Sequence, residues 1–377
     1  MPGLLPDLDP DGLLEYSVVY TDRSLNHMSR QFQQVVKDIS ALLKETYNAR
    51  AAIIVPGSGT FGMESVARQF AQNEKCLIIR NGWFSYRWTQ ILETGNISQD
   101  VHVLKARQIE NTPTGCFAPP PIDEVVAFIE TEKPALVFVP HVETSSGIIL
   151  PDGYVQAIGA AVESIGGIFV LDCIASGAMW IDMKKCKVDV LISAPQKGWS
   201  STPCCAMIGL GDRARAKIEH TQSNSFAMDL KKWLQIIETY ENGGHLYHAT
   251  MPTDGLKQLR DNMQETKALG LETTRARQID LGKKVRALLE SKNFTSVAAP
   301  GFQSPGVVVS YTSDPDIQNG KKFIETGLQS AAGVPLQCDE RADFRTFRLG
   351  LFGLEKLQNV DRTVANLSDA LDRIERH

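Results

Sequence analysis

The stretch VDVLISAPQKGWSSTPCCAMIGL, residues 188–210, places one lysine, Lys197, in a short polar linker between two apolar runs. The runs at 188–193 and 205–210 are nearly continuous, which is typical of strands that are covered on both faces. In an open parallel sheet, ligands bind beyond the carboxyl ends of the strands. The stretch therefore predicts a sheet with an amine at its ligand-binding edge.

Five further apolar runs precede this stretch, at residues 51–55, 76–80, 101–104, 135–140 and 167–172. Between them, apolar residues repeat at three- and four-residue spacing, as over 32–43 and 63–70, which predicts amphipathic helices. Alternation of strand and helix predicts a doubly wound α/β domain with a mainly parallel, seven-stranded sheet.

The pattern changes near residue 269 to a long polar helix, strands at 306–311 and 346–352, and a final amphipathic helix. We expect a smaller α+β domain there. The predicted organisation is an N-terminal segment (1–20), a large domain (21–268) and a small domain (269–377).

Composition favours an ordinary globular protein that acts on small molecules. The 377 residues are 43% hydrophobic and 22% charged, and the net charge is −5 without long runs of either sign. This argues against nucleic acid or a membrane surface as partner. No apolar stretch approaches the roughly 20 residues that span a bilayer, and the start is acidic, so we expect a cytoplasmic protein. The seven cysteines show no CxxC spacing, and no metal site is expected.

A candidate phosphate site follows the first strand, in PGSGTFGMES. Gly57 and Gly59 permit tight turning, and Ser58 and Thr60 add hydroxyls at the start of a helix. Free backbone N–H groups at a helix N-terminus bind phosphate. By itself the stretch is equally compatible with a structural turn and cap.

Two charged residues fall at neighbouring strand ends, Asp172 and Lys197. A carboxylate at the tip of an apolar strand needs a cationic or hydrogen-bonding partner, although a capping role would also explain it. A partly dehydrated lysine favours its neutral amine, which attacks carbonyls. Taken alone, Lys197 would more often be a surface lysine, but together with the phosphate cradle the set suggests pyridoxal 5'-phosphate.

The sequence resembles the class V aminotransferases of pyridoxal phosphate fold type I, especially the alanine–glyoxylate/serine–pyruvate branch with its 2-aminoethylphosphonate relatives. The resemblance runs from about residue 25 to the C-terminus. The motifs that carry it are GSGTFGMES, NGWFSYR, HVETSSGIILP, VLDCIASGAMWID, ISAPQKGW, LYHATMP and FRLGLFG, in the order of the family.

The resemblance implies a role for each matching residue. Lys197 would hold the cofactor covalently and move the proton between the substrate Cα and C4' of the cofactor, and Asp172 would pair with the ring nitrogen. Phe84 would stack on the ring, with a one-residue ambiguity towards Trp83, and the Thr144 hydroxyl would bond the ring oxygen. The phosphate would be bound by Ser58, Gly59, Thr60 and Gln196.

Three further residues extend this set. Tyr247 and Thr250 match residues that reach the phosphate of the partner subunit's cofactor, which implies a homodimer with shared active sites. Arg348 matches the arginine that grips the substrate α-carboxylate, as a planar guanidinium does well. The alternative for Arg348 is a salt bridge on a small-domain strand.

Two departures from the family pattern stand out. The usual Gly-Pro-Gly-Pro-like segment is replaced by a stretch with Asp7 and Asp9, which is either a flexible acidic tail or a different lid for a donor with a distal polar or cationic group. The turn after the lysine contains Cys204 and Cys205, either packing residues or a redox-sensitive pair.

The predicted reaction is ping-pong amino transfer between an alanine- or serine-like amino acid and glyoxylate or pyruvate. The alternatives are a 2-aminoethylphosphonate transaminase or a lyase on the same fold. A catalytically silent cofactor-binding protein and a sugar-phosphate binder without the cofactor also stay open.

Overall fold

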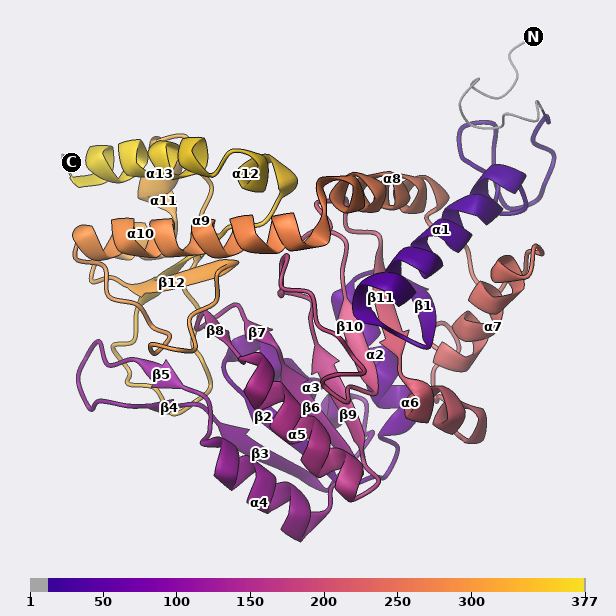
Figure 1. The fold of residues 1–377 in the computed structure, drawn as a ribbon, viewed down its shortest axis with the longest axis horizontal. Coiled ribbons are helices and arrows are strands. Elements are labelled where there is room, and N and C mark those ends of the chain that lie inside the picture. The colour runs from indigo at the N-terminus through magenta and orange to yellow at the C-terminus, as the bar shows by residue number, and fades with distance from the viewer. Residues whose placement is uncertain (1–12, 376–377) are drawn as a thin grey trace.

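The computed structural model describes residues 13–375 and has an α/β architecture with a central seven-stranded sheet (Figure 1). Its strand order is β1-β11-β10-β9-β6-β2-β3. The strands are β1 (Ala51–Pro56), β2 (Cys76–Arg80), β3 (Val101–Lys105), β6 (Leu136–Pro140), β9 (Ile168–Asp172), β10 (Val190–Ser193) and β11 (Cys205–Leu210). All seven predicted runs form strands of this sheet, with small shifts at their ends.

The sheet is parallel except at β11, which pairs antiparallel with both β1 and β10. Because β11 returns antiparallel between them, β1 and β10 run in the same direction as β9, β6, β2 and β3. The carboxyl ends of six strands therefore meet at one edge of the sheet.

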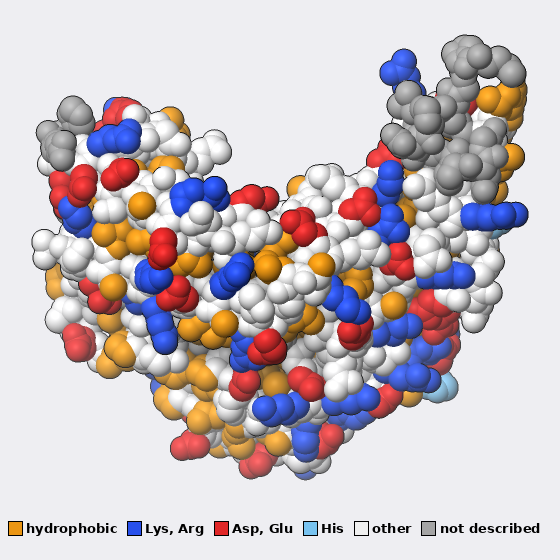
Figure 2. Space-filling model, turned by 45° about the horizontal axis from the view of Figure 1, so that its top comes forward, with side chains coloured by type: hydrophobic (Ala, Val, Ile, Leu, Met, Phe, Trp, Pro, Cys, Tyr) orange, Lys and Arg blue, Asp and Glu red, His pale blue; other side chains and the backbone are white. Residues whose placement is uncertain are grey.

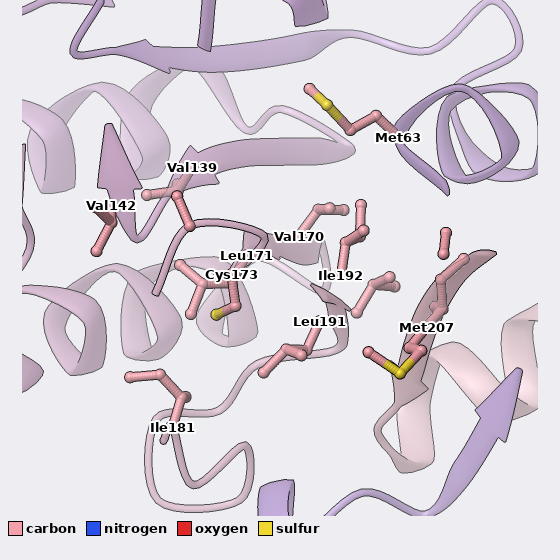
Figure 3. Close-up of a cluster of buried hydrophobic side chains, with 14 of the residues drawn as sticks. Met63, Val139, Val142, Val170, Leu171, Cys173, Ile181, Leu191, Ile192 and Met207 are labelled. Carbon is pink, nitrogen blue, oxygen red and sulfur yellow. The ribbon is translucent and has the colours of Figure 1, made fainter. Parts of the chain in front are cut away.

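Polar and apolar side chains do not alternate along these strands, because helices cover the sheet. Every residue of β2, β6, β9, β10 and β11 is buried. Figure 3 shows apolar side chains of this core, among them Val170, Leu171, Ile192 and Met207 of the sheet and Met63 of α2. Full burial of each aliphatic side chain contributes about 1.5–3 kcal/mol, so this core dominates the stability of the fold.

The helices that surround the sheet are α1 (Arg30–Tyr47), α2 (Gly59–Phe70), α3 (Trp83–Thr94), α4 (Ile122–Glu132), α5 (Asp152–Ser164), α6 (Asp212–Lys217), α7 (Leu230–Glu241) and α8 (Thr253–Leu269). In α1, the Ser29 Oγ accepts a hydrogen bond from the Phe32 N–H, and Asn48 ends the helix in the left-handed conformation. The predicted apolar face of α1 is buried throughout. Short strand pairs β4 (Arg107–Gln108) with β5 (Phe117–Ala118), and β7 (Val142–Glu143) with β8 (Ile148–Ile149), lie outside the main sheet.

The C-terminal part is built around an antiparallel sheet with the order β12-β14-β13. Its elements are α9 (Leu271–Ser291), β12 (Val307–Tyr311), α10 (Pro315–Gln318), α11 (Lys321–Glu325), β13 (Ala331–Ala332), β14 (Thr346–Gly350), α12 (Leu354–Gln358) and α13 (Val360–Glu375). The long helix α9 lies beside α13, as Figure 1 shows. This α+β arrangement agrees with the fold expected after residue 269.

Within residues 13–375, no helix combines the length and apolar character needed to cross a membrane. Figure 2 shows acidic and basic side chains interspersed over the face that it displays. Asp7 and Asp9 lie outside the described residues.

Candidate active site

The strand ends bring Asp172, Lys197 and the Ser58 turn to one edge of the sheet. In β9, Asp172 pairs in register with Pro140 at the end of β6 and with Ile192 in β10. Lys197 lies in the loop between β10 and β11, and Gly57 N–H donates to the Cys204 carbonyl at the end of that loop. The phosphate cradle and the lysine loop are thus hydrogen-bonded neighbours.

Asp172 is buried, with one hydrogen bond to its carboxyl from the Ile174 N–H (2.9 Å). Burial raises its pKa to about 6, and the Ile174 bond and the Lys197 and Arg87 charges offset only part of that effect. A buried carboxyl of this kind is suited to pair with a protonated ring nitrogen, whose positive charge it would stabilise.

Lys197 is partly buried, and its Nζ lies 5.3 Å from the centre of the Phe352 ring. Burial lowers the pKa of Lys197, and the Arg348 and Arg87 charges act in the same direction against the attraction of Asp172. The neutral amine is therefore more populated than on an exposed lysine, as nucleophilic attack or proton transfer requires.

The predicted phosphate cradle is the N-terminus of α2. Ser58 occupies the N-cap without forming a side-chain capping bond, so its hydroxyl is available to a ligand. Gly57 has φ 122°, which favours glycine, and a Cβ on Gly59 would lie 2.6 Å from Ile174 Cδ1. Gly57 is thus favoured by the backbone conformation of this turn, and Gly59 by the close approach of the Ile174 side chain.

Arg87 completes the cradle, although no motif in the sequence singled it out. From α3, its Nη1 donates a hydrogen bond to the Thr60 Oγ1 (3.2 Å). A guanidinium beside helix N–H groups strengthens an anion site. The only feature of the sequence that could have pointed to Arg87 was its position within the NGWFSYR motif.

The Phe84 ring lies close to two guanidinium groups, with its centre 4.7 Å from Arg87 Cζ and 5.3 Å from Arg348 Cζ. Trp83 instead packs beside Tyr86, with ring centres 5.8 Å apart. Phe84 is thus the aromatic residue that shares the surroundings of Arg348, which supports the first of the two stacking assignments.

Arg348 reaches the site from β14 of the C-terminal part. Its Nε donates to the Ala332 carbonyl (2.7 Å), and it forms no ion pair with any residue in 13–375. The salt-bridge alternative is therefore absent from the described residues. Arg341 pairs with Asp343, whereas neither Arg345 nor Arg348 forms an ion pair with a described residue. Arg348 differs from Arg345 in lying beside the Phe84 ring.

Thr144 lies in the turn between β7 and β8, directly after an unpredicted carboxylate, Glu143, which ends β7. Glu143 is fully buried and accepts five hydrogen bonds, from the N–H groups of Phe84, Ser85 and Ser145 and from both serine hydroxyls. It thereby fixes the start of α3, which carries Phe84 and Arg87. Thr144 is buried beside it, whereas Gln196 is exposed next to Lys197.

Tyr247 and Thr250 lie in the loop before α8. Both are exposed, and the Tyr247 Oη lies 2.8 Å from the Thr250 Oγ1. No hydrogen bond in residues 13–375 joins this pair to Lys197, Asp172 or Ser58. The N-terminal segment packs against the same loop, since the Tyr20 hydroxyl donates to the Met251 carbonyl and the rings of His27 and Tyr247 are 5.6 Å apart.

All seven cysteines are free thiols. Cys205 is buried in β11, and its Sγ lies 3.9 Å from the Sγ of Cys204. The neighbouring Cys204 thiol and the burial of Cys205 itself both raise the pKa of Cys205. Burial inside a strand is the packing role expected for Cys205. In the described part of the chain, no group of three His, Cys, Asp or Glu side chains could hold a metal ion.

These residues fit pyridoxal phosphate. The open Ser58 hydroxyl and α2 N-terminus suit a phosphate, buried Asp172 suits a ring nitrogen, and the partly buried Lys197 amine suits an aldehyde.

Comparison with known proteins identifies the family. The aminotransferase class-V profile matches residues 13–321. The chain is 26% identical to an alanine–glyoxylate aminotransferase of Felis catus over 94% of this chain and 83% of that protein. It is 27% identical to a 2-aminoethylphosphonate–pyruvate transaminase of Syntrophobacter fumaroxidans over 91% and 90%.

The fold agrees with a solved structure. An alanine–glyoxylate aminotransferase from Nostoc sp. superposes with a TM-score of 0.77 at 20% identity, covering 92% of this chain and 88% of that one. The seven-stranded sheet and the antiparallel C-terminal sheet are thus those of a fold type I aminotransferase. The chain belongs to the class V aminotransferases.

Proposed function

We propose that this aminotransferase moves an amino group from a small amino acid, alanine or serine, to glyoxylate or pyruvate in a ping-pong reaction. The observation that carries the proposal is the Arg348 guanidinium, which lies beside Phe84 in the same site as Lys197 and forms no ion pair with a residue in 13–375. An arginine without a carboxylate partner is suited to bind the carboxylate that both α-amino acids and 2-oxo acids carry. Similarity to alanine–glyoxylate aminotransferases supports the choice of substrates.

Each residue has a distinct proposed task. Arg348 binds the α-carboxylate and thereby orients the Cα–H bond towards the Lys197 amine. With the cofactor bound, this amine would take the proton from Cα and deliver it to C4' of the cofactor within the same half-reaction, and the second half-reaction would run the transfer in reverse. Asp172 holds positive charge at the ring nitrogen, and Ser58, Gly59, Thr60 and Arg87 hold the phosphate. Bound pyridoxal phosphate supplies the electron-withdrawing ring that stabilises the carbanion left when the proton departs.

We further propose a homodimer in which Tyr247 and Thr250 complete the site of the partner. The support is their exposure and the absence of any hydrogen bond from them to the site residues of the same described chain.

A donor and acceptor panel tests the reaction. Purified holoenzyme is incubated with alanine, serine, aspartate or 2-aminoethylphosphonate, each with and without glyoxylate or pyruvate, and products are quantified by mass spectrometry. We expect alanine or serine to yield its 2-oxo acid together with glycine or alanine from the acceptor. Sustained turnover of a donor without any 2-oxo acid acceptor would instead indicate a lyase, and preference for 2-aminoethylphosphonate would indicate that transaminase.

A further inference from the structure

A second cavity, of about 420 Å³, lies between the start of α5, helix α9 and the turn at 301–305. None of the residues that line it belongs to the candidate active site. Its size lies within the range of about 300–1,000 Å³ that is typical of small-molecule sites.

Helix α9 supplies one wall of the cavity as a row of side chains. Arg275, Ile279, Lys283 and Arg286 all line it. Their spacings of three and four residues place them on one face of the helix. Three of the four are cations, so α9 presents a basic stripe to this solvent-open cavity.

The cavity contains few groups that could neutralise this charge. Arg275 has one distant carboxylate, Asp152, at 3.9 Å between Nη2 and Oδ2. Neither Lys283 nor Arg286 forms an ion pair with any residue of the described chain. Three cations therefore face a single carboxylate, and like charges gathered in a cavity favour an anionic ligand.

Arg286 is held in place but keeps an unused donor. Its Nη2 donates to the Ser304 carbonyl (2.8 Å) and its Nη1 to the Gly282 carbonyl (3.4 Å). Its Nε is buried and has no hydrogen-bond partner, which is unusual for a buried donor. The adjacent Lys284, in contrast, is paired with Asp280 and Asp361 (3.0 and 2.8 Å).

The remaining wall is apolar or neutral. Trp180, whose Nε1 already donates to the Leu271 carbonyl, lines the cavity together with Ile149 and Met179. His141 shares a hydrogen bond with Ser176 (2.7 Å), and burial, together with the Arg275 charge, lowers its pKa to about 3. A ligand here would therefore need an apolar portion as well as negative charge.

We propose that this cavity binds a small organic anion, with its phosphate or carboxylate group on Arg275, Lys283 and Arg286 and its apolar portion on Trp180. The site is separate from the amino-transfer site and does not depend on which substrates that site takes. The His141 backbone N–H donates to the Asp172 carbonyl (2.9 Å), so the wall of the cavity directly adjoins the strand end that carries the proposed ring-nitrogen partner.

Calorimetric titration of the holoenzyme with phenyl phosphate and, separately, with phenylacetate and inorganic phosphate tests the proposal. The phenyl anions combine both required features, and the two acidic groups distinguish a phosphate ligand from a carboxylate. We expect a phenyl anion to bind and Lys283→Gln/Arg286→Gln to weaken binding at least about tenfold, because two charge-assisted contacts are lost. Inorganic phosphate, which has no apolar portion, is expected to bind more weakly.

Matched controls separate this site from general charge effects and from the active site. Lys284→Gln removes the same charge from the next residue of α9, and Arg348→Gln removes the cation of the candidate active site. Lys284→Gln should bind the phenyl anions like the wild type. Arg348→Gln should lose only any carboxylate binding that occurs in the active site and should keep the binding that Lys283→Gln/Arg286→Gln weakens. Absence of binding at about 10 mM, or equal binding by the double variant and the wild type, would overturn the proposal.

Stability of the double variant is checked by thermal unfolding. If it does not fold, Lys283→Gln alone serves, since Lys283 is exposed and forms no ion pair with a described residue. Its expected effect is about threefold weaker binding, as for a single partly solvated charge. Unchanged binding in that variant would equally refute the assignment.

Discussion

The guanidinium carbon of Arg348 lies 5.3 Å from the centre of the Phe84 ring. Arg348 belongs to β14 in the C-terminal part, whereas Phe84 lies in the first turn of helix α3 beside the central sheet. The proposed carboxylate site is thus assembled from two elements that are far apart in the sequence, and its geometry depends on the packing between them.

Replacement of Arg348 by glutamine should lower kcat/KM for alanine about 10- to 100-fold, mainly through KM, because a charge-assisted pair contributes about 1.5–3 kcal/mol. Arg345→Gln is the matched control, since Arg345 donates to the Ser313 carbonyl outside the site. Steady-state kinetics measure both variants. Equal losses in the two would show that Arg348 does not bind the substrate.

Lys197→Ala should reduce amino transfer by about 10²- to 10⁴-fold or more, because it removes the group proposed to move the Cα proton. The variant should also lose the visible absorption band of the lysine-linked cofactor, while a cofactor analysis after denaturation reports whether the cofactor is still bound. Lys184→Ala, at an exposed lysine, should retain both band and activity. A fully active Lys197→Ala protein would disprove the assignment.

Titration of Asp172 should make the free energy of unfolding of the cofactor-free protein depend on pH. Its pKa is about 6 when folded and 3.8 ordinarily, so the folded chain binds more protons between these values. The free energy of unfolding should therefore fall by about 3 kcal/mol as pH rises from about 4 to about 6, and then change no further from this cause.

Urea unfolding at several pH values, compared between wild type and Asp172→Asn, isolates that contribution. The asparagine variant should lack this part of the decline and should be the more stable protein at pH 7 without cofactor. In kinetic assays it should be the less active one, since it cannot stabilise a cationic ring nitrogen. Identical pH profiles would mean that Asp172 is solvated or paired differently.

Gly82→Ala should destabilise the fold by about 1–3 kcal/mol, as overpacking does. A Cβ at Gly82 would lie 2.0 Å from the Ser145 Oγ and 2.8 Å from the Glu143 Cγ, against the network that fixes α3. Gly153→Ala, with no atom within 4 Å of the added Cβ, is the control and should be neutral or slightly stabilising. Thermal unfolding of both proteins distinguishes the two expectations.

Hybrid dimers test whether the active sites are shared. A Lys197→Ala chain and a Tyr247→Phe/Thr250→Val chain should each be impaired, but a mixed dimer contains one site with Lys197 from one chain and intact Tyr247 and Thr250 from the other. Activity should therefore reappear on co-refolding the two variants, and light scattering should show a dimer. Lack of recovery in a confirmed mixed dimer would place each site within a single chain.

The sequence alone determined the main sheet, because continuous apolar runs between turn residues are compatible with little else than strands buried on both faces. It also predicted that Asp172 and Lys197 lie at the same edge of the sheet, since parallel strands present their carboxyl ends at a common edge. The family motifs then supplied the roles of residues such as Arg348 and Thr144 as hypotheses, which periodicity could not have provided.

Only the tertiary structure decided which side chains share an environment across distant elements. It placed Phe84 rather than Trp83 beside Arg348, brought Arg87 to Thr60, and buried Glu143 among five donors at the start of α3. Local sequence patterns carry no information on such contacts, because they depend on how helices and the C-terminal sheet pack against the core. In the sequence, the basic stripe of α9 likewise looks like an ordinary exposed helix face, and only the structure places it in a cavity with α5 and the 301–305 turn.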